Sequence, residues 1–134
     1  MTDYLLDTNH ASRFLAGAEP ITGRIKALAS GEHRFGIAIT VLGELYFAAY
    51  ASQRRAANLQ AIRAFLADVI LWPFDSATAE EFGRILAEQK AKGRPIPPLD
   101  AQIAAVARRH DLVLLTADRH FAFVTGVVVE NWLA

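Results

Sequence analysis

Four acidic residues stand out because each lies beside a strand-like or helix-like apolar segment: Asp7, Glu44, Asp100 and Asp118. Carboxylates that converge without compensation repel one another, and a divalent cation would remove that repulsion. Sites built only from oxygen ligands suit Mg²⁺ or Mn²⁺, hard ions that keep several waters and also bind phosphate oxygens. The chemistry open to such a set is hydrolysis of a phosphodiester by a metal-activated water.

Short apolar runs predict the strands that would position these acids. The runs cover residues 4–6, 35–39, 69–72, 113–115 and 127–129. They are nearly continuous rather than alternating, which is typical of strands in a sheet covered on both faces. We therefore expect a buried central sheet.

Helical patterns fill the intervals between these runs. Apolar residues recur at helical spacing in three places: Leu59, Ile62 and Leu66; Phe82, Ile85 and Leu86; Ile103, Val106 and Ala107. The proline-rich segment 93–98 cannot be a helix interior, so it is expected to be a loop that leads into a helix near Asp100. Strands alternating with helices predict a three-layer α/β/α sandwich with a mainly parallel central sheet.

The composition narrows the class of protein. With 134 residues, 53% of them hydrophobic, the chain can form one core, so residues 1–134 are expected to be a single domain. The absence of cysteine excludes disulfides, zinc thiolate sites and thiol nucleophiles, and favours a reducing cytoplasm. No basic leader and no membrane-length apolar run is seen, which predicts a soluble protein without a membrane partner. The 14 basic residues balance 14 acidic ones, so overall charge gives no argument for nucleic-acid binding.

Two of the acids are expected at the carboxyl edge of the sheet, where ligands bind in open α/β folds. Asp7 follows the first strand directly, and Asp118 comes three residues after Leu115. Asp111 precedes the fourth strand and should lie at the opposite edge. If the first and fourth strands are neighbours, Asp7 and Asp118 face each other across a crevice.

The other two acids are expected on helices that begin at the same edge. Thr40 is predicted to cap the helix after the second strand, which puts Glu44 one step past the capping-box position and inside an apolar run. A buried carboxylate there would need a cation or a hydrogen-bond donor. Asp100 is expected in the first turn of its helix.

Three polar neighbours, Thr8, Asn9 and Thr116, offer hydroxyl and amide groups that could orient a carboxylate or a water. Capping and turn formation are equally good explanations of all three.

Each acid also has a purely structural interpretation. Asp7 could cap a helix over residues 8–16, and Asp100 could simply favour the helix dipole. Glu44 could be a surface residue, and Asp118 could be a turn residue. The hypothesis of a site depends on the edge that the four residues share.

In these segments the sequence resembles the PIN-domain family and, within it, the VapC-type toxins of bacterial toxin–antitoxin pairs. The matching pieces are residues 5–9, 40–45, 98–107, 115–121 and 129–132. The resemblance implies Mg²⁺- or Mn²⁺-dependent cleavage of RNA, often a transfer or ribosomal RNA, a cognate antitoxin that restrains the toxicity, and a homodimer.

Carried over by position, the resemblance makes Asp7, Glu44 and Asp100 the three best-defined acidic ligands. Asp118 stands where the family commonly has Asn with another acid a few residues on, and this chain has His120 and Phe121 there. We expect Asp118 to bind the metal directly or through a water.

The sequence is also compatible with other functions. A phosphatase with an aspartyl nucleophile would generally need a second acid where this chain has Asn9. A DNA or structure-specific nuclease could use the same metal centre, and a catalytically silent domain could bind only a partner protein. Lys90, Lys92 and Arg94 could contact phosphates or belong to a solvated loop.

Overall fold

The computed structural model describes residues 2–133, in which five strands form one fully parallel sheet of order β3-β2-β1-β4-β5. The strands are β1 (Asp3–Leu6), β2 (Arg34–Ala38), β3 (Ile70–Trp72), β4 (Val113–Leu115) and β5 (Val128–Glu130). All five were predicted from the apolar runs, with bounds that differ by one residue at most ends.

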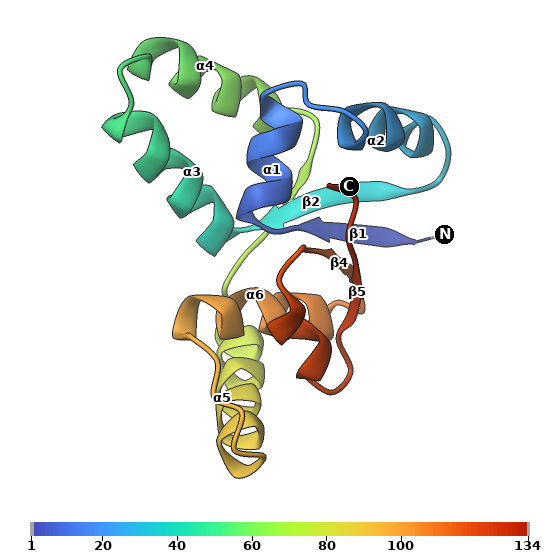
Figure 1. Cartoon of the computed structure of the whole chain (residues 1–134), viewed down its shortest axis with the longest axis vertical. Helices are drawn as coiled ribbons and strands as arrows, with labels where there is room; N and C mark the ends of the chain where they lie inside the picture. Colours follow the sequence, from blue (N-terminus) through green and yellow to red (C-terminus); the bar gives the residue numbers. More distant parts are fainter. Residues whose placement is uncertain (1, 134) are drawn as a thin grey trace.

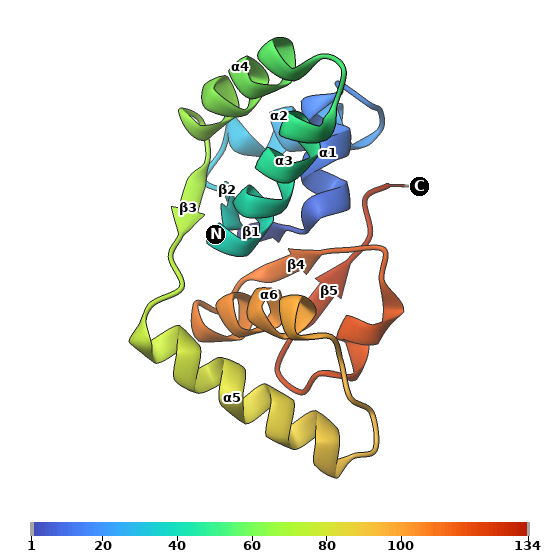
Figure 2. The ribbon, with the colours of Figure 1, turned by 90° about the vertical axis from the view of Figure 1, so that its left-hand side faces the viewer.

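Helices cover both faces of this sheet. In the described part of the chain they are α1 (Thr8–Leu15), α2 (Ile21–Ala29), α3 (Ile39–Ala51), α4 (Arg55–Leu66), α5 (Ser76–Ala91) and α6 (Pro98–Arg109), with a 3₁₀ helix at Arg119–Phe123. Helices α1 to α4 lie on one face, and α5 and α6 on the other (Figures 1 and 2). The predicted three-layer α/β/α sandwich is confirmed.

The strand order reverses between β1 and β4, which are hydrogen-bonded neighbours. Leu5 pairs with Leu114 and Leu6 with Leu115, and the backbone N–H of Asp7 donates to the Leu115 carbonyl at 3.1 Å. From β1 the chain proceeds outward through β2 to β3, and it then returns through α5 and α6 to form β4 on the other side. The neighbour relationship assumed from the sequence is therefore present.

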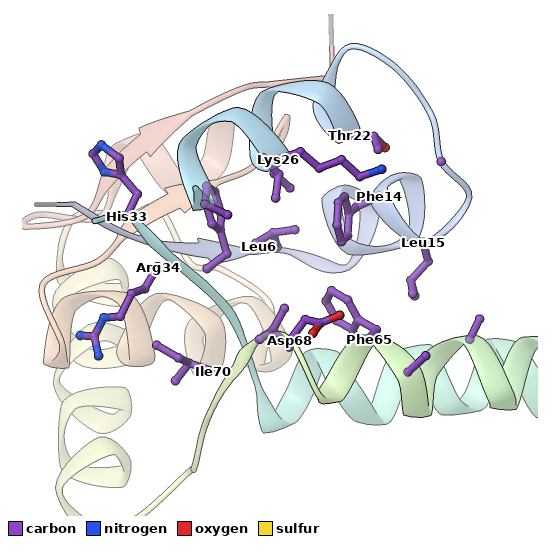
Figure 3. A pocket seen from close by; sticks show the side chains of 17 residues that line it. Leu6, Phe14, Leu15, Thr22, Lys26, His33, Arg34, Phe65, Asp68 and Ile70 are labelled. Atoms are coloured by element: carbon purple, nitrogen blue, oxygen red, sulfur yellow. The ribbon is translucent and has the colours of Figure 1, made fainter. Parts of the chain in front are cut away.

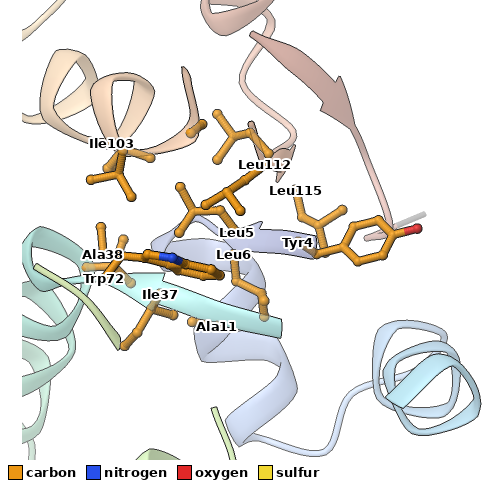
Figure 4. Close-up of a cluster of buried hydrophobic side chains, with 14 of the residues drawn as sticks. Tyr4, Leu5, Leu6, Ala11, Ile37, Ala38, Trp72, Ile103, Leu112 and Leu115 are labelled. Atoms are coloured by element: carbon orange, nitrogen blue, oxygen red, sulfur yellow. The ribbon is translucent and has the colours of Figure 1, made fainter. Parts of the chain in front are cut away.

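The core is apolar on both sides of the sheet. Leu5, Leu114 and Ile37 are fully buried, and Figure 4 shows the strand side chains packed with Trp72 and Ile103. Burying this apolar surface is the main driving force that holds the layers together. The carboxyl edge of the sheet is thus a rigid base for the residues that follow each strand. No helix within residues 2–133 is long and apolar enough to cross a membrane.

Two details differ from the predictions. Helix α3 begins at Ile39 with Ala38 as its N-cap residue, so Thr40 does not cap it. The strand continues into the helix without a turn, and the Thr40 hydroxyl instead donates a 2.7 Å hydrogen bond to Oε1 of Gln102 on α6. Helix α2 was not predicted, although Ile21, Ile25 and Leu28 have helical spacing.

Candidate active site

Asp7 is held at the start of α1 by its first-turn neighbours. It is 8% exposed, and its Oδ1 accepts hydrogen bonds from the backbone N–H of His10 at 2.8 Å and from the His10 ring Nδ1 at 3.0 Å. The N-cap interpretation is therefore correct, and it coexists with the position at the carboxyl edge. Within residues 2–133 no hydrogen bond is made to Asp7 Oδ2, so this oxygen remains available to a ligand.

Glu44 lies half-buried on α3, and its Oε1 accepts a 2.7 Å hydrogen bond from the hydroxyl of Thr8. Thr8 is the first residue of α1, so this contact ties the starts of α1 and α3 together. The interpretation of Glu44 as a simple surface residue is wrong, because the side chain is partly buried and has a donor from another helix.

Asp118 and Thr116 form a small turn after β4. The backbone N–H of Asp118 donates to the Thr116 hydroxyl at 3.0 Å, and Thr116 is buried. The Asp118 Oδ1 accepts from the backbone N–H of His120 at 2.9 Å and lies 2.8 Å from its Nδ1. Asp118 thus caps the 3₁₀ helix, as the turn interpretation expected.

The pKa of Asp100 is affected by the other three acids. It lies half-buried in the first turn of α6, which starts at the carboxyl edge because it precedes β4 on the return crossover. Burial raises its pKa above the ordinary aspartate value, and the negative charges of Asp118, Glu44 and Asp7 raise it further, while His120 opposes the shift. The fold therefore brings all four acids within one electrostatic environment.

The donor chemistry of this cluster fits a hard divalent cation, because every candidate ligand is a carboxylate oxygen. Burial is the largest cause of the raised pKa of Asp100, and the nearby carboxylates add negative charge that a cation would compensate. Within residues 2–133 no three His, Asp or Glu side chains lie close enough together to hold a metal ion as they stand. Mg²⁺ usually keeps several waters and takes only one or two carboxylates, so it does not need such a complete set.

The model of the PIN domain family matches residues 4–126, nearly the whole chain. The chain belongs to the PIN domain family. It is 32% identical over 133 residues to the tRNA(fMet)-specific endonuclease VapC of Shigella flexneri, covering 98% of this chain and 99% of that protein.

Solved VapC-containing structures share this PIN fold. DNA-bound VapBC from Salmonella typhimurium aligns with a TM-score of 0.89 at 30% identity, covering 98% of this chain and 99% of the other. VapBC2 from Rickettsia felis, bound to a promoter DNA fragment, has a TM-score of 0.90 at 23% identity, with the same coverage, and this supports the fold alone.

A hollow of about 790 Å³ adjoins the acidic edge of this PIN domain. Thr8, Glu44 and Gln102 line it, together with the exposed apolar residues Ile39, Phe47 and Leu99 and the partly buried Phe74. Its lining thus combines polar residues, among them Glu44, with apolar ones. Such a hollow can accept a polar group next to a flat apolar one.

The other residues considered for the site contact the four acids less directly or not at all. Asn9 is exposed, and its side chain makes no hydrogen bond within the described residues, so it does not contact the acids as Thr8 does. Lys92 donates to the Thr125 hydroxyl at 2.7 Å, and the Arg94 guanidinium stacks on Phe123 at 3.9 Å. These two basic residues are exposed, and both contact the segment after Asp118.

Sequence reasoning missed His10, which contacts Asp7 directly. The signal was present, because the third residue after an N-cap is the one whose side chain can reach back to the cap. Gln102, which accepts a hydrogen bond from the Thr40 hydroxyl and lines the hollow, was also missed. In the sequence, Gln102 could not be distinguished from an exposed polar residue on an apolar helix.

Proposed function

We propose that this chain is a metal-dependent endoribonuclease and the toxin component of a toxin–antitoxin pair. The observation that carries the proposal is that Asp100, besides being partly buried, lies near enough to Asp118, Glu44 and Asp7 for their charges to help raise its pKa. Membership of the PIN domain family and likeness to proteins called VapC endonuclease support the same activity. A cluster of carboxylates on a rigid sheet edge is a costly arrangement unless a cation uses it.

Mg²⁺ or Mn²⁺ would be held by Asp7, Glu44, Asp100 and Asp118. A cation bound there would supply an activated water and charge compensation for hydrolysis of a phosphodiester. The chain's own residues prepare the ligands: Thr8 fixes one oxygen of Glu44, and the Thr116 hydroxyl fixes the turn that carries Asp118. Ligands fixed in this way lose less freedom when the cation arrives.

The proposed substrate is RNA, and a transfer or ribosomal RNA in particular. The Shigella relative is called a tRNA(fMet)-specific endonuclease, and the relative from Haemophilus influenzae is called a ribonuclease. A DNA or structure-specific nuclease could use the same acids. Cleavage of RNA and DNA oligonucleotides of one sequence distinguishes the two, and preferential cutting of the DNA would overturn the RNA assignment.

The deciding experiment is incubation of the purified protein with total cellular RNA, with and without Mg²⁺ or Mn²⁺. Asp7→Asn keeps the shape of the side chain and removes its charge, so we expect folded protein without metal-dependent cleavage. Asp111→Asn is a matched control, because Asp111 lies at the opposite edge and its φ of 55° is a conformation that Asn adopts readily. Unchanged cleavage by Asp7→Asn would remove Asp7 from the mechanism, and no cation binding by the wild type would favour a silent, partner-binding domain.

A cognate antitoxin is the second part of the proposal. An apolar groove of about 710 Å³ lies between α1, α2 and α4, and Phe14, Leu15 and Phe65 face it (Figure 3). Lys26 and Arg34 lie at its margin. An amphipathic antitoxin segment with apolar anchors and acidic flanks would complement this surface.

The antitoxin assignment can be tested by blocking the groove. Ala64 lines it from α4 and is exposed, so Ala64→Arg should abolish co-purification with the cognate antitoxin while the protein stays folded. Ala56→Arg, an exposed position of the same helix outside the groove, is the control. Equal retention of the antitoxin by both variants would place its binding elsewhere.

A homodimer is the third part. Phe47 is 76% exposed and Tyr50 54% exposed on α3, and the partly buried Tyr46 lies beside them. Exposed aromatic residues are enriched in protein contact surfaces. Because Phe47 also borders the hollow beside Glu44, pairing through this surface would bring two acidic sites near one another.

A further inference from the structure

One histidine links the acidic edge to the C-terminal segment. His10 is fully buried, and its ring bridges two groups that are far apart in the sequence. Its Nδ1 lies 3.0 Å from Oδ1 of Asp7, and its Nε2 accepts the backbone N–H of Trp132 at 3.1 Å. Both ring nitrogens therefore have partners, and one of the partners is a candidate metal ligand.

These contacts determine which ring nitrogen carries the proton. A backbone N–H can only donate, so His10 Nε2 must present its lone pair to Trp132. The proton of the ring then lies on Nδ1, where it is donated to the carboxylate of Asp7. Asp7 Oδ1 thus receives two N–H donors from one residue, the ring at 3.0 Å and the backbone at 2.8 Å.

Trp132 is itself fixed by several contacts of its side chain. The residue is 1% exposed, and its indole packs on Tyr4 with 4.9 Å between ring centroids. The indole N–H donates to Oε1 of Glu130 at 2.9 Å, and the guanidinium of Arg24 lies 4.1 Å from the indole centroid. An amide anchored in this way is a rigid donor that holds the His10 ring in one orientation.

We propose that His10 is a positioning residue of the acidic site and that the segment around Trp132 is its support. The inference rests on the proposed function. His10 fixes one oxygen of Asp7 and leaves Oδ2 free for a ligand, and Trp132 fixes the proton position of His10. Partners that orient a ligand in this manner typically change metal affinity by about 10- to 100-fold when removed.

A purely structural role is the alternative, since any buried histidine needs hydrogen-bond partners. Two substitutions separate the roles, because an Asn amide reaches the place of Nδ1 and a Gln amide reaches the place of Nε2. His10→Asn keeps a donor to Asp7 and loses the acceptor for Trp132. His10→Gln keeps that acceptor and loses the donor to Asp7.

The first measurement needs neither cation nor substrate. Nitrogen NMR of the imidazole in the cation-free protein should show the Nδ1–H tautomer for His10. Hydrogen exchange at the Trp132 amide should be slow in the wild type and in His10→Gln, and fast in His10→Asn. An Nε2–H tautomer, or a Trp132 amide that exchanges equally fast in all three proteins, would overturn the proposal.

The second measurement is Mn²⁺ binding by titration calorimetry, at a temperature where every variant is folded. We expect His10→Gln to bind about 10- to 100-fold more weakly than the wild type, and His10→Asn to stay close to it. His110→Asn, at the C-terminal end of α6, is a histidine control that should bind normally. Equal affinity, or equal loss, in His10→Gln and His10→Asn would overturn the positioning role.

A failure of the proposed function would give results different from a failure of the His10 role. A wild-type protein that shows the Nδ1–H tautomer and the protected Trp132 amide but binds no Mn²⁺ would overturn the metal-dependent nuclease and, with it, the role of His10 toward a cation. A wild type that binds Mn²⁺ and cuts RNA, with an Nε2–H tautomer at His10, would overturn the positioning role alone.

Discussion

The hydroxyl of Thr8 and Oε1 of Glu44 are joined by a 2.7 Å hydrogen bond that spans 36 positions of the sequence. The donor begins the helix after β1, and the acceptor lies on the helix after β2. This contact directly connects the segments that carry Asp7 and Glu44. Its removal therefore tests whether the geometry of the acids matters beyond their presence.

Replacing Thr8 with Val keeps the size of the side chain and deletes the donor. We expect a loss of about 1.5 kcal/mol in stability, typical of a hydrogen bond to a charged acceptor, together with slower cleavage at limiting Mn²⁺. Thr8→Ser restores the hydroxyl and should recover both properties. Urea unfolding and the Mn²⁺ dependence of cleavage measure the two effects, and full activity in Thr8→Val would show that Glu44 needs no such support.

Replacing Asp100 with Asn should stabilise the cation-free protein at neutral pH. The folded-state pKa of Asp100 is raised, so its ionised form costs stability above that pKa, and the cost disappears as the pH falls through it. The advantage of the variant should therefore vanish below the ordinary aspartate pKa of 3.8. Thermal unfolding at several pH values, with Asp111→Asn as the control for losing one charge, measures this difference.

The same variant should respond differently to cation. Mn²⁺ binds the folded state and should raise the melting temperature of the wild type. The rise should be much smaller in Asp100→Asn, because one ligand is lost. An equal rise in both proteins would exclude Asp100 from the metal site.

Gly36 should tolerate no side chain. A Cβ there would meet the backbone oxygen of Ile70 and the ring of Trp72 well inside contact distance. Since backbone cannot move aside cheaply, Gly36→Ala should cost about 3 kcal/mol or more. Gly83→Ala, in an open helical position with nothing within 4 Å, should instead stabilise by about 0.5 to 1 kcal/mol. Chemical denaturation of the two variants gives both values.

Phe47→Glu should weaken the proposed dimer. A charge placed in the centre of an apolar contact typically removes about 2 kcal/mol or more, which corresponds to roughly a 30-fold weaker association. Light scattering over a range of concentrations measures the dissociation constant. Gln60→Glu, an exposed position on α4, controls for the added charge. A dimer that withstands Phe47→Glu would place the interface on another face.

The sequence predicted the fold better than the detailed contacts. The strands could be identified because each is an unbroken apolar run, and the order of strands and helices restricts a parallel sheet to few topologies. The adjacency of β1 and β4 was only assumed, since pairing between strands more than a hundred residues apart leaves no local signal. Helix α2 was missed because its short apolar pattern is interrupted by Thr22, Gly23 and charged residues.

Two of the acids could be assigned to the carboxyl edge for a related reason. Position after a strand is a local property, so Asp7 and Asp118 could be assigned to the carboxyl edge from the sequence. The partners of Asp7 could not, because the Trp132 amide reaches His10 only after the chain has folded back across 122 positions. Thr40 shows the same limit, since a capping residue and a residue that bonds to another helix look alike in sequence.

The order of the chain has a consequence for the cell that makes it. The acids at the carboxyl edge come from residues 7, 44, 100 and 118, and the support of the first of them comes from residue 132. A ribosome that has polymerised the first hundred residues has therefore not yet produced a complete cutting centre. If the chain cuts RNA as proposed, growing polypeptides and prematurely terminated products would be harmless to nearby transcripts, and the hazard would begin only when synthesis is nearly finished.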